Sequence, residues 1–523
     1  MNITDSKDKN NRAYDAIVIG AGNGGLVAAA RVAMKGAKVL LLEQHNLPGG
    51  FASSFVRGRF EFETSLHELY DYSTPENKGG IRILFEDRLN IDADFVPVPE
   101  AYRLIVTNPD EKMDVVLPFG VEDFIQAVEK EVPGSEDSVR KFFQLGKEID
   151  EATTYIGKMR GNPDQDVLLK EHTNFLRTAA YPIDDIQDAL NIPERARAIL
   201  NAYWLYLGVP TSRVNTTVFA AMVHGYILKG AYIPKMRSHE YTSAIEAKIR
   251  EYNGDVEYNS KVQRILVNKG KVMGVQTNKG EIINTNHVIC NASPTLTYNN
   301  LIHPKSEVPE IAFKQINART HGVATIVVYM GLDTTAEKLG LKDYSYFICD
   351  TMDTDQLYDS LINLEVPKVQ ATLCLNNAIS DCSPPGTCII SITSAFRPGA
   401  WDNVKPEEYF DVKTKIADGL IENFEKATGV QIRDHIEEIE VATPQTFSRF
   451  TGTYNGVIYG YELESWDSII PRLQSMNDEK YIEGLEFCGG FGKRGHGYSS
   501  SLKDGETAAL FTIQSLMKEG VIK

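Results

Sequence analysis

The sequence predicts an α/β protein of at least two domains, and three features lead to this fold class. The chain has 523 residues, which is too many for one compact core. Near its start, an apolar run, a glycine-rich turn and an Ala-rich stretch follow one another in the order strand, turn, helix. Farther along, residues 120–230 carry apolar residues at three- and four-residue spacing, which predicts a largely helical insertion.

The first predicted unit is a complete β-α-β motif. Residues 14–19 (YDAIVI) are rich in β-branched residues, as expected of a strand buried on both faces. The turn GAGNGG follows, then a helix ending at Gly36, and then a second buried strand that ends on an acid. The helix N-terminus can hold a pyrophosphate and the acid can bind a ribose. We therefore assign these residues to a dinucleotide site: Gly20, Gly22, Gly25 and Glu43.

A second Gly-Gly turn, Gly49-Gly50 in LPGGFASS, follows the ribose-binding acid closely. It lets the backbone approach a phosphate again, in a place where nicotinamide-binding folds do not usually do so. The segment resembles the extended FAD fingerprint of flavoproteins in the amine oxidase and phytoene desaturase superfamily. The resemblance implies FAD rather than NAD as the cofactor, with Gly49 and Gly50 in its site.

The resemblance extends in the same order over most of the chain. RFEFETSLHEL (residues 59–69) resembles the F-x-F-D-T-G-x-H segment of retinol saturase and carotenoid isomerase relatives, and His67 keeps its place. Residues 259–294 resemble the strand-rich return to the FAD domain, where the residue at Val262 contacts the adenine side through its backbone. Within them, Lys269-Gly270 and Lys279-Gly280 predict hairpin turns, and residues 287–293 predict another buried strand. Residues 383–401, 442–462 and 484–490 also resemble family segments, and the last implies Gly489 and Gly490 as cofactor-binding residues.

The resemblance implies a two-domain flavoprotein with a Rossmann-like FAD domain and an inserted α+β substrate domain. The FAD domain is predicted from residues 12–70, 232–300 and 475–523. The substrate domain is predicted from residues 71–231, mostly helical, and 301–474, with strands at 321–333 and 388–396. Each single residue of the aromatic stretches NAYWLYLGVP and VFAAMVHGYILKGAYI is expected to belong to the hydrophobic core. As a group they suit a large apolar ligand or a membrane-dipping face.

Two departures from the family pattern involve candidate site residues. The acid that usually follows the first glycine of the last strand is replaced by Gly490. The flavin contact expected of that acid must then come from the backbone or from elsewhere. The family's P-x-G-G-M turn is replaced by PKMRS, which puts Arg237 where a small residue lets the backbone approach the flavin.

Flavin chemistry at an alkene needs a proton donor or an electrophilic stabiliser. The alternatives left open are that an Arg pairs with an FAD phosphate and that His67 is structural. A serine after Tyr498 is expected to cap the last helix. The candidates for catalysis or substrate anchoring are His67, Arg237, Arg494, His496 and Tyr498.

The late stretch GGFGKRGHGYSSS also contains G-x-G-x-x-G, through Gly490, Gly492 and Gly495. After Gly495 only 28 residues remain, and no strand ending on an acid follows the predicted helix. We therefore interpret this stretch as the closing edge of one FAD site and not as a second nucleotide site.

Composition excludes several classes of function. The formal net charge of −17 argues against a nucleic-acid partner. The histidines and the six cysteines show no metal-ligand spacing, and no G-x-S-x-G elbow is present. The polar start is not a secretory signal, and no apolar run approaches about 18 residues. These features favour a cytoplasmic protein with reduced thiols and leave peripheral membrane association, the electron partner and the oligomeric state open.

The leading hypothesis is an FAD-dependent oxidoreductase of the saturase or desaturase type. Its substrate would be a lipophilic small molecule such as a carotenoid, retinoid, steroid or unsaturated fatty acid. Arg237, Arg494 and His496 favour an oxygenated substrate with a carboxylate or carbonyl. The alternatives are a redox-neutral double-bond isomerase, a flavin amine oxidase, and a flavin-binding protein without catalysis.

Overall fold

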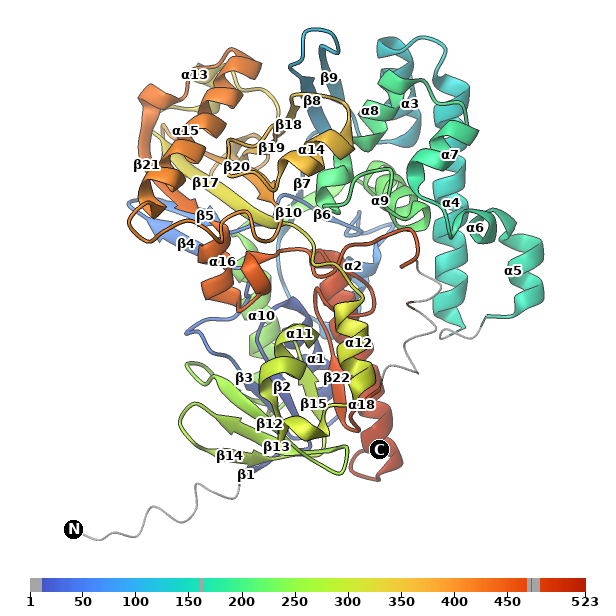
Figure 1. Ribbon diagram of the computed structural model, residues 1–523, viewed down its shortest axis with the longest axis vertical. Helices are drawn as coiled ribbons and strands as arrows, with labels where there is room; N and C mark the ends of the chain where they lie inside the picture. Colours follow the sequence, from blue (N-terminus) through green and yellow to red (C-terminus); the bar gives the residue numbers. More distant parts are fainter. Residues whose placement is uncertain (1–11, 160–162, 468–471, 473–479) are drawn as a thin grey trace.

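The computed structural model describes residues 12–159, 163–467, 472 and 480–523 (Figure 1). The polar start of the chain and residue 475, the predicted start of the last FAD-domain segment, lie outside the described residues. In Figure 1 a parallel sheet with its helices forms the lower lobe, and a larger sheet and a helical region form the upper one. The predicted α/β fold class is confirmed.

The lower lobe is built on a five-stranded parallel sheet that brings together segments far apart in the sequence. Strands β2 and β3 are completely buried, as their apolar runs predict. Helices α1 (Asn23–Ala33), α10 (Ser238–Glu251) and α18 (Tyr498–Lys518) cover the sheet. The strand order is β11 (Asp255–Glu257), β3 (Val39–Leu42), β2 (Ala16–Ile19), β15 (Val288–Cys290) and β22 (Leu485–Phe487).

A second sheet packs below the first and contains both predicted hairpins. Lys269 and Gly270 have positive φ angles of 52° and 72°, and Gly280 has one of 79°, which suits tight turns. The order is β1 (Arg12–Ala13), β14 (Ile282–Asn284), β13 (Lys271–Thr277), β12 (Val262–Asn268) and β16 (Ile302–His303).

The upper lobe contains a seven-stranded sheet, antiparallel except where β18 pairs with β8. The strands predicted at 321–333 and 388–396 are two neighbouring strands inside it, β17 and β20. Helix α15 (Tyr409–Thr428) packs on one face. The order is β21 (Ile436–Ala442), β17 (Ala324–Leu332), β20 (Cys388–Phe396), β19 (Val369–Cys374), β18 (Ser345–Cys349), β8 (Tyr102–Val106) and β9 (Met113–Leu117).

Two small sheets connect the lobes. The hairpin of β4 (Ser54–Arg57) and β5 (Phe60–Glu63) packs its aromatic rings against Tyr329 of β17. Strand β10 (Ala231–Pro234) lies between β6 (Leu69–Tyr70) and β7 (Phe95–Pro97). These strands hold residues 54–70 between the two large sheets.

The described residues of 121–159 and 163–229 are largely helical, as the apolar spacing predicts. Their main helices are α3 (Val121–Glu131), α4 (Glu136–Lys158) and α9 (Thr216–Lys229). Shorter helices lie between them: α5 (Gln165–Glu171), α6 (Thr173–Thr178), α7 (Ile183–Ala189), α8 (Glu194–Asn201) and the 3-10 helix η3 (Ala202–Tyr206).

The remaining helices connect the strands. They are α2 (Gly80–Arg82), the π-helix η2 (Ile83–Leu89), α11 (Pro294–Leu296), η4 (Thr297–Leu301), η5 (Lys305–Glu307), α12 (Glu310–Asn317), α13 (Ala336–Leu339), α14 (Thr354–Ser360), η6 (Leu375–Asn377), η7 (Arg433–His435), α16 (Pro444–Thr451) and η8 (Tyr454–Gly456).

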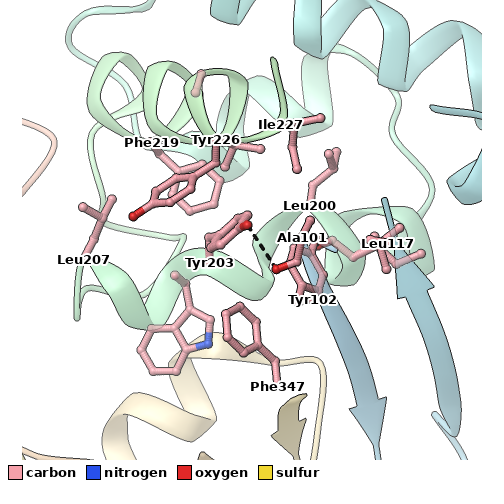
Figure 2. Close-up of a cluster of buried hydrophobic side chains, with 14 of the residues drawn as sticks. Ala101, Tyr102, Leu117, Leu200, Tyr203, Leu207, Phe219, Tyr226, Ile227 and Phe347 are labelled. Atoms are coloured by element: carbon pink, nitrogen blue, oxygen red, sulfur yellow. Dashed lines mark hydrogen bonds between the residues drawn. The ribbon is translucent and has the colours of Figure 1, made fainter. Parts of the chain in front are cut away.

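Helix α9 has two apolar faces with different neighbours. Phe219, Ala220, Val223 and Ile227 are completely buried in the core of the helical region. Figure 2 shows Tyr203 of η3 packed beneath this helix, with its hydroxyl donating to the carbonyl of Ala101. The other face lines a cavity with Val218, Ala221, Met222, Gly225 and Lys229.

The predicted serine cap of the last helix is wrong. Helix α18 begins at Tyr498, and its N-cap is Gly497 with φ 90° and no side-chain cap. Ser499 instead donates its hydroxyl hydrogen to the carbonyl of Tyr70 at 2.8 Å. The chain reaches this helix through a left-handed turn that glycine tolerates, so no capping side chain is required.

Within the described ranges, no helix is long and apolar enough to cross a bilayer. The same ranges contain no group of three His, Cys, Asp or Glu side chains placed to hold a metal ion.

Candidate active site

One continuous cavity of about 1420 Å³ lies between the two lobes. It is larger than the roughly 300–1,000 Å³ of a typical small-molecule pocket. At one end it meets the carboxyl ends of β2, β3 and β15, where parallel sheets bind ligands. At the other end it is lined by η3 and α9. The cavity therefore has room for a dinucleotide and a second ligand.

The wall of the cavity is basic although the protein is acidic. Of the residues that the structure describes, nine Lys and Arg side chains line it against five Asp and Glu, while the whole chain has a net charge of −17. A cleft of one charge sign concentrates ligands of the opposite sign. The electrostatics therefore favour a ligand that carries phosphate groups.

The sheet end of the cavity is built from two glycine turns that are hydrogen-bonded to each other. Gly49 donates its N–H to the carbonyl of Ala21 at 2.8 Å, and Gly22 forms a bridge with Gly49. Gly20 and Gly49 have φ angles of 91° and 116°, which disfavour any other residue. Helix α1 has no side-chain cap, so its first N–H groups remain available for an anion.

Two further glycines allow close packing around this turn. A Cβ on Gly24 would lie 2.6 Å from the nitrogen of Gly489 in the turn after β22. A Cβ on Gly25 would lie 1.9 Å from the carbonyl oxygen of Gly20. Gly489 lines the cavity, whereas Gly25 lies behind the lining defined by the described residues. Gly25 thus sets the distance between α1 and β2, as the third glycine of the fingerprint does.

Glu43 is oriented by the backbone at the cavity wall. Its Oε2 accepts from the N–H of Ala21 at 2.6 Å, and its Oε1 accepts from the N–H of His45 at 2.9 Å. Each oxygen can still accept another hydrogen bond, because a carboxylate has about four lone-pair sites. Val262, at the start of β12, lines the same region. Together with the glycine turns, these residues fit a dinucleotide with its ribose at Glu43 and its pyrophosphate at α1.

Sequence reasoning missed Asn291, which lies among the glycine turns. Its Nδ2 is 2.6 Å from the position of a Cβ on Gly22, and its Oδ1 is 2.2 Å from that of a Cβ on Gly489. The thiol of Cys488 donates to the same Oδ1 at 3.6 Å. Asn291 directly follows β15, a strand that the sequence predicted. Its place at the carboxyl end of a parallel strand was the signal that could have found it.

The turn after β22 is organised by another residue that was missed, Asp504 of α18. Its Oδ1 accepts from the N–H groups of Lys493 and Arg494 at 3.2 and 3.3 Å. Burial raises the pKa of Asp504 to about 7. A Cβ on Gly490 would meet only Ser501 Oγ within 4 Å, at 3.9 Å, so Gly490 leaves space open beside the cavity.

His67 and Glu68 lie next to each other at the helical end of the cavity. The Nε2 atom of His67 is hydrogen-bonded to Thr393 Oγ1 at 2.8 Å, and its ring lies 5.8 Å from that of Tyr206. Burial lowers the pKa of His67 to about 4, so it is neutral at physiological pH. Burial raises the pKa of Glu68 to about 8, so this acid carries its proton. Glu68 was missed because nothing in its spacing distinguishes it from a surface acid.

His496 and Tyr498, which follow the last strand, also line the cavity. The ring of His496 stacks on Tyr459 with centroids 4.6 Å apart. Burial and the nearby charge of Arg472 lower the pKa of His496 to about 3. The Tyr498 hydroxyl donates to the carbonyl of Phe51 at 2.8 Å. His496 is therefore a neutral hydrogen-bonding group and not a cation.

The two candidate arginines lie in different surroundings. Arg494 is exposed where it lines the cavity, and its Nε donates to Thr507 Oγ1 at 2.9 Å. Arg237 lies outside the cavity lining formed by the described residues and is 4% exposed. Its guanidinium donates to the carbonyls of Glu61 and Cys382 at 3.3 and 2.6 Å. The chemical roles of all five candidate side chains stay predictions.

Comparisons with known proteins agree with this geometry. Residues 18–77 match the family model described as an NAD(P)-binding Rossmann-like domain. The chain is 26% identical to an all-trans-retinol 13,14-reductase of Danio rerio, over 88% of this chain and 79% of that protein. The rat enzyme of the same name is 27% identical over 68% of this chain and 60% of its own length. A chloroplastic prolycopene isomerase of Daucus carota is 24% identical over 86% of this chain and 73% of that protein.

Solved structures resemble the whole fold. An oxidoreductase from Methanosarcina mazei superposes with a TM-score of 0.61 at 16% identity, covering 96% of this chain and 99% of the other. A putrescine oxidase bound to putrescine superposes with a TM-score of 0.64 at 13% identity, covering 96% and 100%. At this identity the likeness shows a shared two-domain architecture.

Proposed function

We propose that this chain binds FAD and reduces or oxidises a carbon–carbon bond of a lipophilic substrate. It belongs to the superfamily of flavin-dependent oxidoreductases that includes retinol 13,14-reductases and prolycopene isomerases. The observation that carries this proposal is the continuity of the cavity. It joins a glycine-built dinucleotide cradle to a chamber walled by apolar and aromatic side chains. Such a chamber suits a large apolar ligand placed beside the cofactor.

The protein's part in this reaction is to bind, orient and exclude water. The flavin, when bound, supplies hydride transfer. The glycine turns, α1 and Glu43 would hold its nucleotide part, and the second glycine turn at Gly49 supports FAD as the dinucleotide. Tyr206, Tyr226 and Tyr459 line the chamber with rings that shield the reacting carbons from water.

An oxygenated substrate remains part of the proposal because Arg494 lines the cavity. Its exposed guanidinium can pair with a carboxylate or carbonyl at the end of a substrate. Arg494→Ala should then weaken the binding of an acidic substrate by about tenfold or more and leave a pure hydrocarbon unaffected. Equal affinity of the variant and the wild type for both substrates would contradict the anchor.

A second candidate function is a redox-neutral isomerisation of a double bond. It is favoured by the similarity to prolycopene isomerases along 86% of this chain. It differs from saturation or desaturation in consuming no electrons overall. The ratio of product formed to reductant consumed therefore distinguishes the two reactions.

The test starts from the visible spectrum of the purified protein and mass analysis of any cofactor it releases. The protein is then reduced without oxygen and offered retinoids, carotenoids, steroids, unsaturated fatty acids and amines. We expect bound FAD, reoxidation by one lipophilic class, and a product changed at a carbon–carbon bond. A protein without flavin, or one that reacts only with amines, would overturn the proposal.

A further inference from the structure

The most unusual group in the cavity is the carboxyl of Glu68, which is 5% exposed and lines the chamber. Among the described residues, the phenols of Tyr203 and Tyr206 are its polar neighbours, but neither the oxygens of Glu68 nor the hydroxyl of Tyr206 make a hydrogen bond of good geometry. A buried polar group without a partner costs about 1–3 kcal/mol, and most native proteins avoid it. This cost suggests that a ligand supplies the missing partner.

Burial keeps Glu68 protonated. It raises the pKa of Glu68 by more than the phenols of Tyr206 and Tyr203 lower it, and the buried carboxyl of Glu100 raises it further. The Oε1 atom of Glu100 accepts hydrogen bonds from the N–H groups of Tyr344 and Ser345. Burial also raises the pKa values of the tyrosines here, so they remain neutral: Tyr102, Tyr203, Tyr206, Tyr226 and Tyr344.

The other titratable side chains that we predicted for catalysis cannot replace it. Burial lowers the pKa values of His67 and His496 to about 4 and 3, so neither carries a transferable proton at neutral pH. Burial raises the pKa of Tyr498 well above its usual value. Glu68 is thus the group in this set that holds a proton at neutral pH and can release it.

We infer that Glu68, in its carboxylic acid form, is the proton donor to a carbon of the substrate's double bond. This inference rests on the proposed function. In a saturation, the O–H bond of Glu68 breaks and a C–H bond forms at one alkene carbon. The reduced flavin, as the two-electron reductant, provides the hydride for the other carbon. The carboxylate that remains regains its proton from water. In an isomerisation, the same carboxylate takes its proton back.

The first test compares Glu68→Gln, Glu68→Asp and the control Glu100→Gln in the flavin-loaded protein. Glutamine keeps the shape of Glu68 but has no acidic proton, so turnover should fall by about 10²–10⁴-fold while substrate affinity stays near that of the wild type. Wild-type turnover should fall as the pH rises through about 8, and Glu68→Asp should keep such a limb. Glu100→Gln keeps the proton donor, because Glu100 is outside the lining formed by the described residues, so its turnover at pH values below the limb should equal that of the wild type. The limb itself should move to lower pH, because Glu100 raises the pKa of Glu68.

The second test needs no turnover. The infrared spectrum of wild type minus Glu68→Gln isolates one carboxyl from other buried acids. It should show a protonated carboxyl band at neutral pH that disappears as the pH rises through about 8. A band already absent at neutral pH overturns the inference, and so does a Glu68→Gln variant with wild-type turnover. Failure of the proposed function is separate, since the wild type itself would then transform no lipophilic substrate.

Discussion

The two ends of the cavity are built in different ways. The sheet end is made of backbone: Gly20, Gly22 and Gly49 turn the chain, and the start of α1, which has no side-chain cap, lines the cavity. The helical end is made of side chains, among them Glu68 and Tyr206. A site made of backbone needs glycines at fixed spacing, whereas a site made of side chains gathers residues from distant elements. The first kind is visible in a sequence and the second is not.

The largest expected effect tests the backbone-built end. Gly24→Ala places a Cβ 2.6 Å from the nitrogen and 2.8 Å from the Cα of Gly489. Because these are backbone atoms, α1 and the turn after β22 must move apart. We expect the variant to lose nearly all bound flavin, measured by the ratio of visible to ultraviolet absorbance.

The control for this variant is Gly36→Ala. Gly36 has φ 85° but no atom within 4 Å of an added Cβ, so the change adds only backbone strain, about 1 kcal/mol. Its flavin content should equal that of the wild type. If Gly24→Ala also keeps its flavin, the contact between these two turns does not shape the cofactor site.

The next effect tests the side-chain-built end. Ala221 lines the cavity and its neighbour Ala220 is completely buried in the core. Ala221→Phe should fill the chamber and lower kcat/KM by about 10²-fold with flavin retained. Ala220→Phe should instead destabilise the protein by about 1–3 kcal/mol through overpacking. Flavin content, kinetics and denaturation curves of the pair separate the two faces of α9, and identical behaviour would contradict that separation.

Much of the fold could be predicted because local patterns determine it. The buried strand before Gly20, the hairpin turns at Lys269 and Lys279, and the helical spacing of residues 120–230 each correspond to an element of the structure. The capping of the last helix was predicted wrongly. The serines after Tyr498 satisfied a local rule, but Ser499 bonds the carbonyl of Tyr70, a contact that only the tertiary fold creates.

The same difference between local patterns and tertiary contacts separates the site residues that were predicted from those that were missed. The predicted cofactor-binding residues other than Gly25 line the cavity, because the fingerprint fixes their places. Asn291, Asp504 and Glu68 were missed. Asp504 acts through backbone N–H groups of a turn that precedes it in the chain, and Glu68 faces tyrosines from η3 and α9. The contacts of Asp504 and Glu68 depend on how the chain folds back on itself and have no fixed spacing, whereas Asn291 could have been found from its place at the carboxyl end of a parallel strand.

A smaller effect concerns the pH dependence of stability at the buried histidines. The pKa of His496 is about 3 in the folded protein and about 6.5 when unfolded, so below pH 6.5 the unfolded state binds a proton that the folded state does not. Stability from this group is complete above pH 6.5 and falls by about 1.4 kcal/mol per pH unit below it. His496→Phe keeps the stacking on Tyr459 and should show a flatter decline in chemical denaturation. Parallel curves for the two proteins would show that His496 does not titrate this way.

The smallest effect concerns Arg237, whose φ of 70° and ψ of 173° are values that glycine adopts readily. Arg237→Ala and Arg237→Gly both lose the bonds to the carbonyls of Glu61 and Cys382, but only glycine also removes the backbone strain. The glycine variant should therefore be the more stable by about 1 kcal/mol in chemical denaturation. At Met236, an exposed neighbour without a positive φ, the order should reverse, because glycine there only adds freedom to the unfolded chain. If alanine is favoured at both positions, the guanidinium bonds do not hold this turn in a strained conformation.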